Sequence, residues 1–120
     1  MCYSGVVHID KHGKELRRVL PKAKSGNVFA QLLEHYDVNI QSILIKNSNK
    51  VKFNSKLKYS PDYYLFLKVA SEFKIYVQKS FLVKYRVHSE SLSLKSKGVQ
   101  GIEAELALDN VFLNKDTLKI

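Results

Sequence analysis

The sequence predicts a single α/β domain built on a mainly parallel or mixed sheet. Strand-like and helix-like segments alternate along the 120 residues in the order strand, helix, strand, helix, one or two strands, helix. Hydrophobic residues make up 45% of the chain and include 7 tyrosines and 6 phenylalanines, which is enough apolar surface for a core and argues against disorder. A chain of this length forms one domain.

The first strand is predicted over residues 2–10, which read CYSGVVHID and have a β-branched centre. A turn follows, in which Gly13 can take a positive φ. Residues 16–27 (LRRVLPKAKSGN) are predicted to be irregular because Pro21 and Gly26 interrupt them.

The next pair of elements is a helix and a short strand. Asn27 is expected to cap a helix that runs through residues 28–37, where apolar side chains recur at four-residue spacing. Residues 39–46 (NIQSILIK) are predicted to form a strand. Residues 46–58 contain five lysines among Asn and Ser, and this pattern favours a solvated loop, with a loop facing phosphate or a membrane as the alternative.

The clearest local signal is a helix over residues 60–73. Ser60 suits the N-cap and Pro61 the first helical position, and one face of the segment is apolar. Residues 74–88 alternate between apolar and polar side chains and predict two short strands or one bent strand. A last helix is predicted from residue 100 to residue 113.

Composition narrows the functional classes. The formal net charge of +9 comes from 20 basic and 11 acidic residues, but lysine prevails over arginine, so specific reading of nucleic acid is not indicated. A single cysteine, Cys2, excludes an internal disulfide framework and fits a reducing compartment. No apolar run approaches the roughly 20 residues that span a bilayer, and the first ten residues do not resemble a signal peptide. We expect a cytoplasmic protein, or one peripheral at the inner face of the membrane.

Two positions could carry chemistry. Asp62 lies in the first turn of the predicted helix, where it either complements the helix dipole or acts as a general base. His88 ends a predicted strand and has no second histidine or cysteine at metal-ligand spacing.

The residues before His88 form a cationic strand end. Lys84, Arg86 and His88 project from one strand face and suit an oligophosphate or a carboxylate. Ser89, Ser91 and Ser93 either add hydroxyl groups or form a turn. The chain contains no nucleophile elbow, P-loop or G-x-G-x-x-G.

Residues 60–93 resemble the C-terminal part of a bacterial family 2 glycosyltransferase of the GT-A fold. That family typically has E-D-Y-D-L-x-L-R at the start of a helix and L-x-x-Y-R-x-H-x-x-S-x-S after the next strand. The matching residues here are Asp62, Tyr63, Leu65 and Leu67 in the first motif, and Leu82, Tyr85, Arg86, His88, Ser91 and Ser93 in the second. Residues 2–14 resemble the strand and turn that follow the family's D-x-D motif, and residues 27–46 resemble its next helix and strand, so the likeness spans nearly the whole chain.

The resemblance implies a partial GT-A fold, a mixed sheet flanked by helices, with residues 1–120 as the acceptor-side part of a catalytic domain. It implies transfer of a sugar, with inversion, from a nucleotide-sugar donor to a hydroxyl of a carbohydrate or lipid-linked acceptor in cell-surface polysaccharide synthesis. Asp62 would be the catalytic base, Tyr63, Arg86 and Ser91 would bind substrate, and His88 would bind a divalent metal. That metal would be Mn²⁺ or Mg²⁺ in the full-length enzyme.

The chain departs from the family pattern at three positions, where Pro61, Tyr64 and Lys68 replace an acid, an aspartate and an arginine. The family's N-terminal half, with its nucleotide-binding unit and D-x-D pair, has no counterpart in the sequence. We therefore expect the chain alone to be inactive, and to self-associate or to pair with the missing half. The alternative is a non-enzymatic basic module in which the lysines of residues 46–58 contact anionic lipid or nucleic acid.

Overall fold

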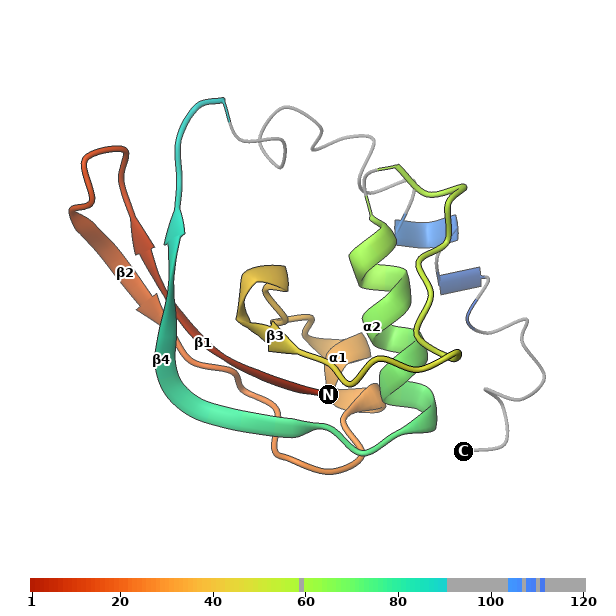
Figure 1. The fold of residues 1–120 in the computed structure, drawn as a ribbon. Coiled ribbons are helices and arrows are strands. Elements are labelled where there is room, and N and C mark those ends of the chain that lie inside the picture. Colours follow the sequence, from red (N-terminus) through yellow and green to blue (C-terminus); the bar gives the residue numbers. More distant parts are fainter. Residues whose placement is uncertain (59, 91–103, 107, 110, 112–120) are drawn as a thin grey trace.

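The sheet is built around β1 (Cys2–Ile9), which pairs with three other strands (Figure 1). β4 (Tyr76–Arg86) runs parallel to β1 along its whole length, from Cys2 opposite Tyr76 to Ile9 opposite Arg86. The other side of β1 pairs antiparallel with β2 (Glu15–Val19) and, nearer its start, with β3 (Ile43–Leu44). The predicted mixed sheet is therefore confirmed. The computed structural model describes residues 1–58, 60–90, 104–106, 108–109 and 111.

The predicted turn after β1 is confirmed and is closed by a side chain. The carboxylate of Asp10 accepts hydrogen bonds from the backbone N–H groups of His12 (2.8 Å) and Lys14 (2.9 Å), and Gly13 has a φ of 88°. The prediction of an irregular segment over residues 16–27 was wrong for residues 16–19, which belong to β2, whereas residues 20–27 lie outside the helices and strands, as predicted. The side chains of β2 are largely exposed. The strand is therefore stabilised by backbone pairing with β1 and not by burial of its side chains.

The predictions for residues 28–46 were partly wrong. α1 (Phe29–Glu34) is shorter than expected, and its N-cap is Val28 instead of Asn27. The predicted strand begins with a 3₁₀ turn, η1 (Ile40–Ser42), and only β3 is extended. Asn39 explains the turn, since its side chain accepts from the Gln41 N–H and its carbonyl from the Ser42 hydroxyl (2.7 Å).

α2 (Pro61–Glu72) begins as predicted, with Ser60 at the N-cap and Pro61 in the first turn. Both helices lie on the same side of the sheet in Figure 1. The core fills the space between these helices and the sheet, and its fully buried side chains include Tyr3, Leu32, Leu65, Leu67 and Ile75.

Residues 76–86 form one bent strand, which decides between the two alternatives that the sequence left open. The pairing of β1 with β4 shifts register on both sides of Gly5, which lies opposite Phe81. A Cβ atom at Gly5 would lie 2.8 Å from the carbonyl oxygen of Val19 and 3.1 Å from that of Ser80. Glycine is therefore required where three backbones approach one another.

The last predicted helix lies mostly outside the described residues. The described part of this segment, residues 104–106, 108–109 and 111, is helical, and Val111 is buried against the core. Within the part of the chain that the structure describes, no helix is both long enough and apolar enough to cross a membrane. The molecule is a small mixed α/β domain with an open sheet.

Candidate functional site

Asp62 lies in the first turn of α2 and is half-buried. The helix begins in front of it with a hydrogen bond from the Tyr64 N–H to the Ser60 carbonyl (3.3 Å). The unpaired N–H groups of a first helical turn make this a common position for an acidic side chain such as Asp62.

Two aromatic rings accompany Asp62. The ring of Tyr63 meets that of Tyr36 edge to face, with 4.7 Å between centroids and 71° between planes. The Tyr36 hydroxyl is buried and has no hydrogen-bond partner among the described residues. Burial raises the pKa of Tyr36, and the negative charge of Asp62 raises it further. The carboxylate and the two phenol rings therefore form one partly buried wall at the start of α2.

Arg86 lies at the end of β4, and its side chain forms hydrogen bonds with the neighbouring turn. One terminal nitrogen, Nη1, donates to the carbonyl oxygens of Asp10 (2.8 Å) and Lys11 (2.9 Å). The same strand end is fixed to β1 by a hydrogen bond from the Val87 N–H to the Ile9 carbonyl (2.8 Å). The guanidinium is thus positioned by the β1–β2 turn and remains exposed to solvent.

His88 and Ser91 follow Arg86. His88 is exposed and lies between the end of β4 and the turn at residues 89–90. Ser91 lies outside the described residues, so its predicted role is not tested. No group of three His, Cys, Asp or Glu residues comes together to bind a metal ion within the described ranges. His88 remains a predicted ligand whose partners would come from elsewhere.

The two predicted halves of the site lie toward the same end of the molecule. α2 begins and β4 ends at the upper end of the view in Figure 1, because the helix descends from that end while the strand rises toward it. No contact joins Asp62 to Arg86 or His88 among the interactions described above. The structure therefore brings the carboxylate and the cationic strand end toward one end of the fold.

Two residues beside this wall, Tyr3 and Asp37, were not identified from the sequence. The Tyr3 hydroxyl donates to a carboxylate oxygen of Asp37 (2.9 Å), and the other oxygen accepts from the Lys22 N–H (2.6 Å). Burial raises the pKa of Tyr3, and the hydrogen bond to Asp37 raises it further. The sequence pattern could have indicated Tyr36, because this residue belongs to a repeat of apolar side chains. Nothing in the local sequence indicates Asp37, because its hydrogen-bond partners are distant along the chain.

Two cavities lie away from these residues. One, of about 520 Å³, lies between the loop after β3 and the C-terminal end of α2, and the other, of about 410 Å³, lies beside α1. Neither is lined by Asp62, Arg86 or His88. Comparison of the chain with protein-family models, with curated proteins and with solved structures found no match.

Proposed function

We propose that the chain is the acceptor-side part of an inverting glycosyltransferase. The observation that supports this best is the placement of Asp62, beside two aromatic rings, at the same end of the fold as the cationic end of β4. A carboxylate that receives a proton and a guanidinium that neutralises a leaving anion are the two groups that such a transfer needs.

In this proposal Asp62 removes the proton from an acceptor hydroxyl as its oxygen attacks the anomeric carbon of the donor. A carbon–oxygen bond forms to the acceptor, and the bond to the nucleoside diphosphate breaks, which leaves negative charge on the diphosphate. Arg86 lies at the diphosphate side, with Nη1 occupied by the turn and its positive charge available to the anion. Mn²⁺ or Mg²⁺ bound in part by His88 would supply further positive charge. Tyr63 would contact the acceptor.

The test uses a chimera in which this chain follows the nucleotide-binding half of a bacterial family 2 glycosyltransferase. We expect Mn²⁺-dependent transfer of a radiolabelled sugar, and we expect Asp62→Asn to lower kcat at least about a hundredfold, the usual contribution of a general base. Glu72→Gln is the matched control, because it removes a carboxylate from the opposite end of the same helix.

Two results would count against the enzyme. One is transfer that survives Asp62→Asn. The other is tight, salt-sensitive binding of the chain to unrelated polyanions with no transfer in any chimera, which is the behaviour of a basic binding module.

We also propose self-association through the outer edge of β4. In the described part of the chain this strand pairs with β1 alone, and Leu82 on it is 68% exposed. An open edge with exposed apolar side chains favours pairing with another strand. We expect a dimer by analytical ultracentrifugation at high micromolar concentration, and a shift toward monomer in Leu82→Lys. Leu33→Lys on α1 is the matched control, and a wild-type protein that is monomeric at that concentration would contradict the prediction.

A further inference from the structure

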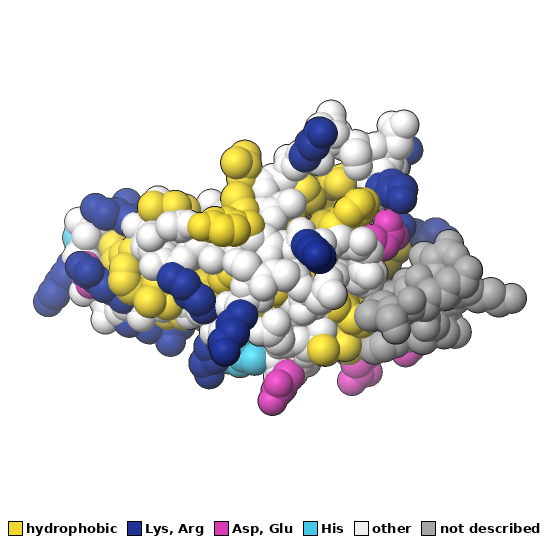
Figure 2. All heavy atoms as spheres, turned by 90° about the horizontal axis from the view of Figure 1, so that it is seen from below, with side chains coloured by type: hydrophobic (Ala, Val, Ile, Leu, Met, Phe, Trp, Pro, Cys, Tyr) yellow, Lys and Arg dark blue, Asp and Glu magenta, His cyan; other side chains and the backbone are white. Residues whose placement is uncertain are grey.

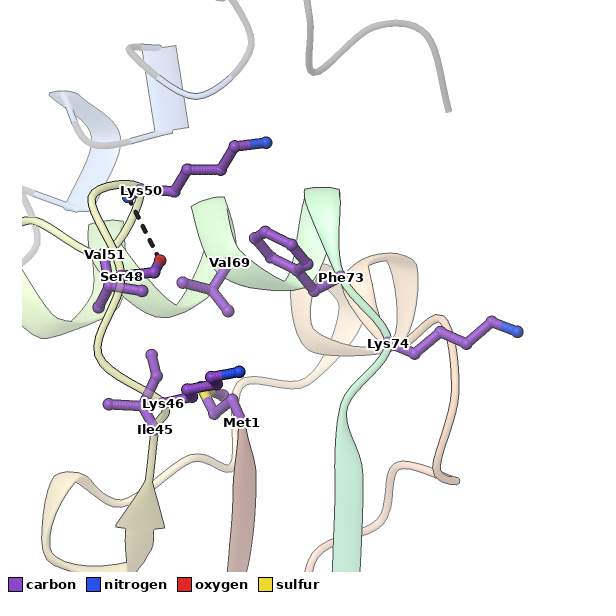
Figure 3. A pocket seen from close by; sticks show the side chains of 9 residues that line it. All are labelled: Met1, Ile45, Lys46, Ser48, Lys50, Val51, Val69, Phe73 and Lys74. Atoms are coloured by element: carbon purple, nitrogen blue, oxygen red, sulfur yellow. Dashed lines mark hydrogen bonds between the residues drawn. The ribbon is translucent and has the colours of Figure 1, made fainter.

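The larger cavity combines an apolar interior with basic side chains. It lies between the C-terminal end of α2 and the loop that follows β3, with the start of the chain beside it (Figure 3). Its volume of about 520 Å³ is in the range of small-molecule sites. The apolar side chains that line it are Met1, Ile45, Val51, Val69 and Phe73.

Three of the nine lining residues are lysines, and none is acidic. In Figure 3 the side chain of Lys46 extends into the space between Met1 and Val69, whereas Lys74 extends away from it. The ammonium group of Lys50 lies 5.6 Å from the centre of the Phe73 ring, within the range of a cation–π contact. Two positive charges therefore border an apolar space, and none of the nine described residues that line it carries a negative charge.

The local backbone explains why these groups meet. The carbonyl of Ser48 accepts from the Val51 N–H (3.1 Å) and its hydroxyl accepts from the Lys50 N–H (3.3 Å), which makes a turn that directs Val51 toward α2. Val69 and Phe73 are four residues apart and so lie on one face of the helix end. The pocket is built by a closed turn and a helix.

We propose that this pocket binds an anionic amphiphile, a molecule with a single phosphate head and an aliphatic tail. The tail would lie against the apolar walls, where each buried methylene adds to affinity. The head would lie between Lys46 and Lys50, since lysine binds phosphate as a point charge. The pocket is near the C-terminal end of α2 and Asp62 is at its N-terminal end, so the proposal does not depend on the proposed function.

The test is calorimetric titration of the chain with octyl phosphate below its micelle concentration. Inorganic phosphate represents the head alone and octanol the tail alone. We expect octyl phosphate to bind at least tenfold more tightly than either. The double substitution Lys46→Gln with Lys50→Gln should weaken binding about tenfold or more, whereas Lys52→Gln with Lys56→Gln removes the same charge from the same loop outside the pocket and should not. Val51→Trp, which fills the cavity, should abolish binding while the far-UV circular dichroism is retained.

Several results would overturn the proposal. Equal weakening in the two double variants would mean a diffuse charge effect, and equal affinity for octanol and octyl phosphate would mean an apolar cavity without a head site. Binding to anionic vesicles without binding to octyl phosphate would assign these lysines to a membrane surface instead. A dimer that Val51→Trp dissociates, and that octyl phosphate does not, would place a second copy of the chain in the pocket. If Val51→Trp does not fold, the difference in octyl phosphate affinity between the two double variants still tests the proposal.

Discussion

Replacement of Gly5 by alanine is expected to lower the free energy of unfolding by about 3 kcal/mol or more, at the upper end for an overpacked site. The added Cβ would meet the carbonyl oxygens of Val19 and Ser80, and these atoms belong to the backbones of β2 and of β4. Backbone of paired strands cannot rotate aside as a flexible side chain can, so the sheet must separate at its centre. For a domain of ordinary stability this loss is a large fraction of the total free energy of unfolding.

Gly13→Ala is the matched control for this prediction. A Cβ at Gly13 would have no atom within 4 Å, and its cost of about 1 kcal/mol comes only from a φ of 88°. Urea unfolding followed by far-UV circular dichroism compares the two variants. A Gly5→Ala protein as stable as Gly13→Ala would show that β2 and β4 do not approach β1 as closely as described.

Alkaline pH is expected to unfold the protein through two buried tyrosines. The pKa values of Tyr3 and Tyr36 are raised in the fold, by burial first and then by Asp37 and Asp62 respectively. In the unfolded chain both phenols lose their protons near pH 10. Above that pH the unfolded state binds fewer protons than the folded state, so stability is fully present below pH 10 and falls as pH rises. Each tyrosine contributes about 1.4 kcal/mol per pH unit, and the pair about 2.7 kcal/mol.

Urea unfolding at a series of pH values from 8 to 12 measures this slope. Tyr36→Phe should reduce the slope by about half. It should leave stability at pH 7 unchanged or higher, because it removes a buried hydroxyl that lacks a partner among the described residues. Tyr76→Phe removes an exposed hydroxyl and serves as control. A slope unaffected by Tyr36→Phe would contradict the burial of that hydroxyl.

The parts of the fold that follow local rules were predictable from the sequence. The start of α2 depends on Ser60 and Pro61, and the turn after β1 depends on Asp10 and Gly13, all within a few residues of the elements that they set. β2 was missed because its side chains are exposed, so its strand state comes from pairing with β1, which a pattern of buried residues does not reveal.

The site was predictable only as a set of residue types. The sequence identified Asp62, Tyr63 and Arg86, and the structure brings their segments toward one end of the molecule. It did not reveal that Arg86 contacts the carbonyls of the β1–β2 turn, because those acceptors are 75 and 76 residues away in the sequence. A contact between residues that are distant along the chain cannot be inferred from the local sequence around either of them.

Basic and hydrophobic side chains are interspersed on the surface of the molecule. Figure 2 shows lysine and arginine side chains over much of one face, with hydrophobic side chains exposed between them. The basic side chains on this face are therefore interspersed with apolar ones, and a specific site for an anion needs a local feature such as the turn at Ser48.

The parallel pairing of β1 with β4 has a consequence during synthesis. At typical translation rates of roughly 5 to 20 residues per second, β4 leaves the ribosome several seconds after β1. In that interval the nascent chain exposes one whole edge of β1, whose centre is buried in the folded domain and includes the apolar side chains of Val6 and Val7. A chaperone that binds extended apolar segments would meet its target there, and the yield of native protein in a cell would then depend on how fast the remaining residues are made.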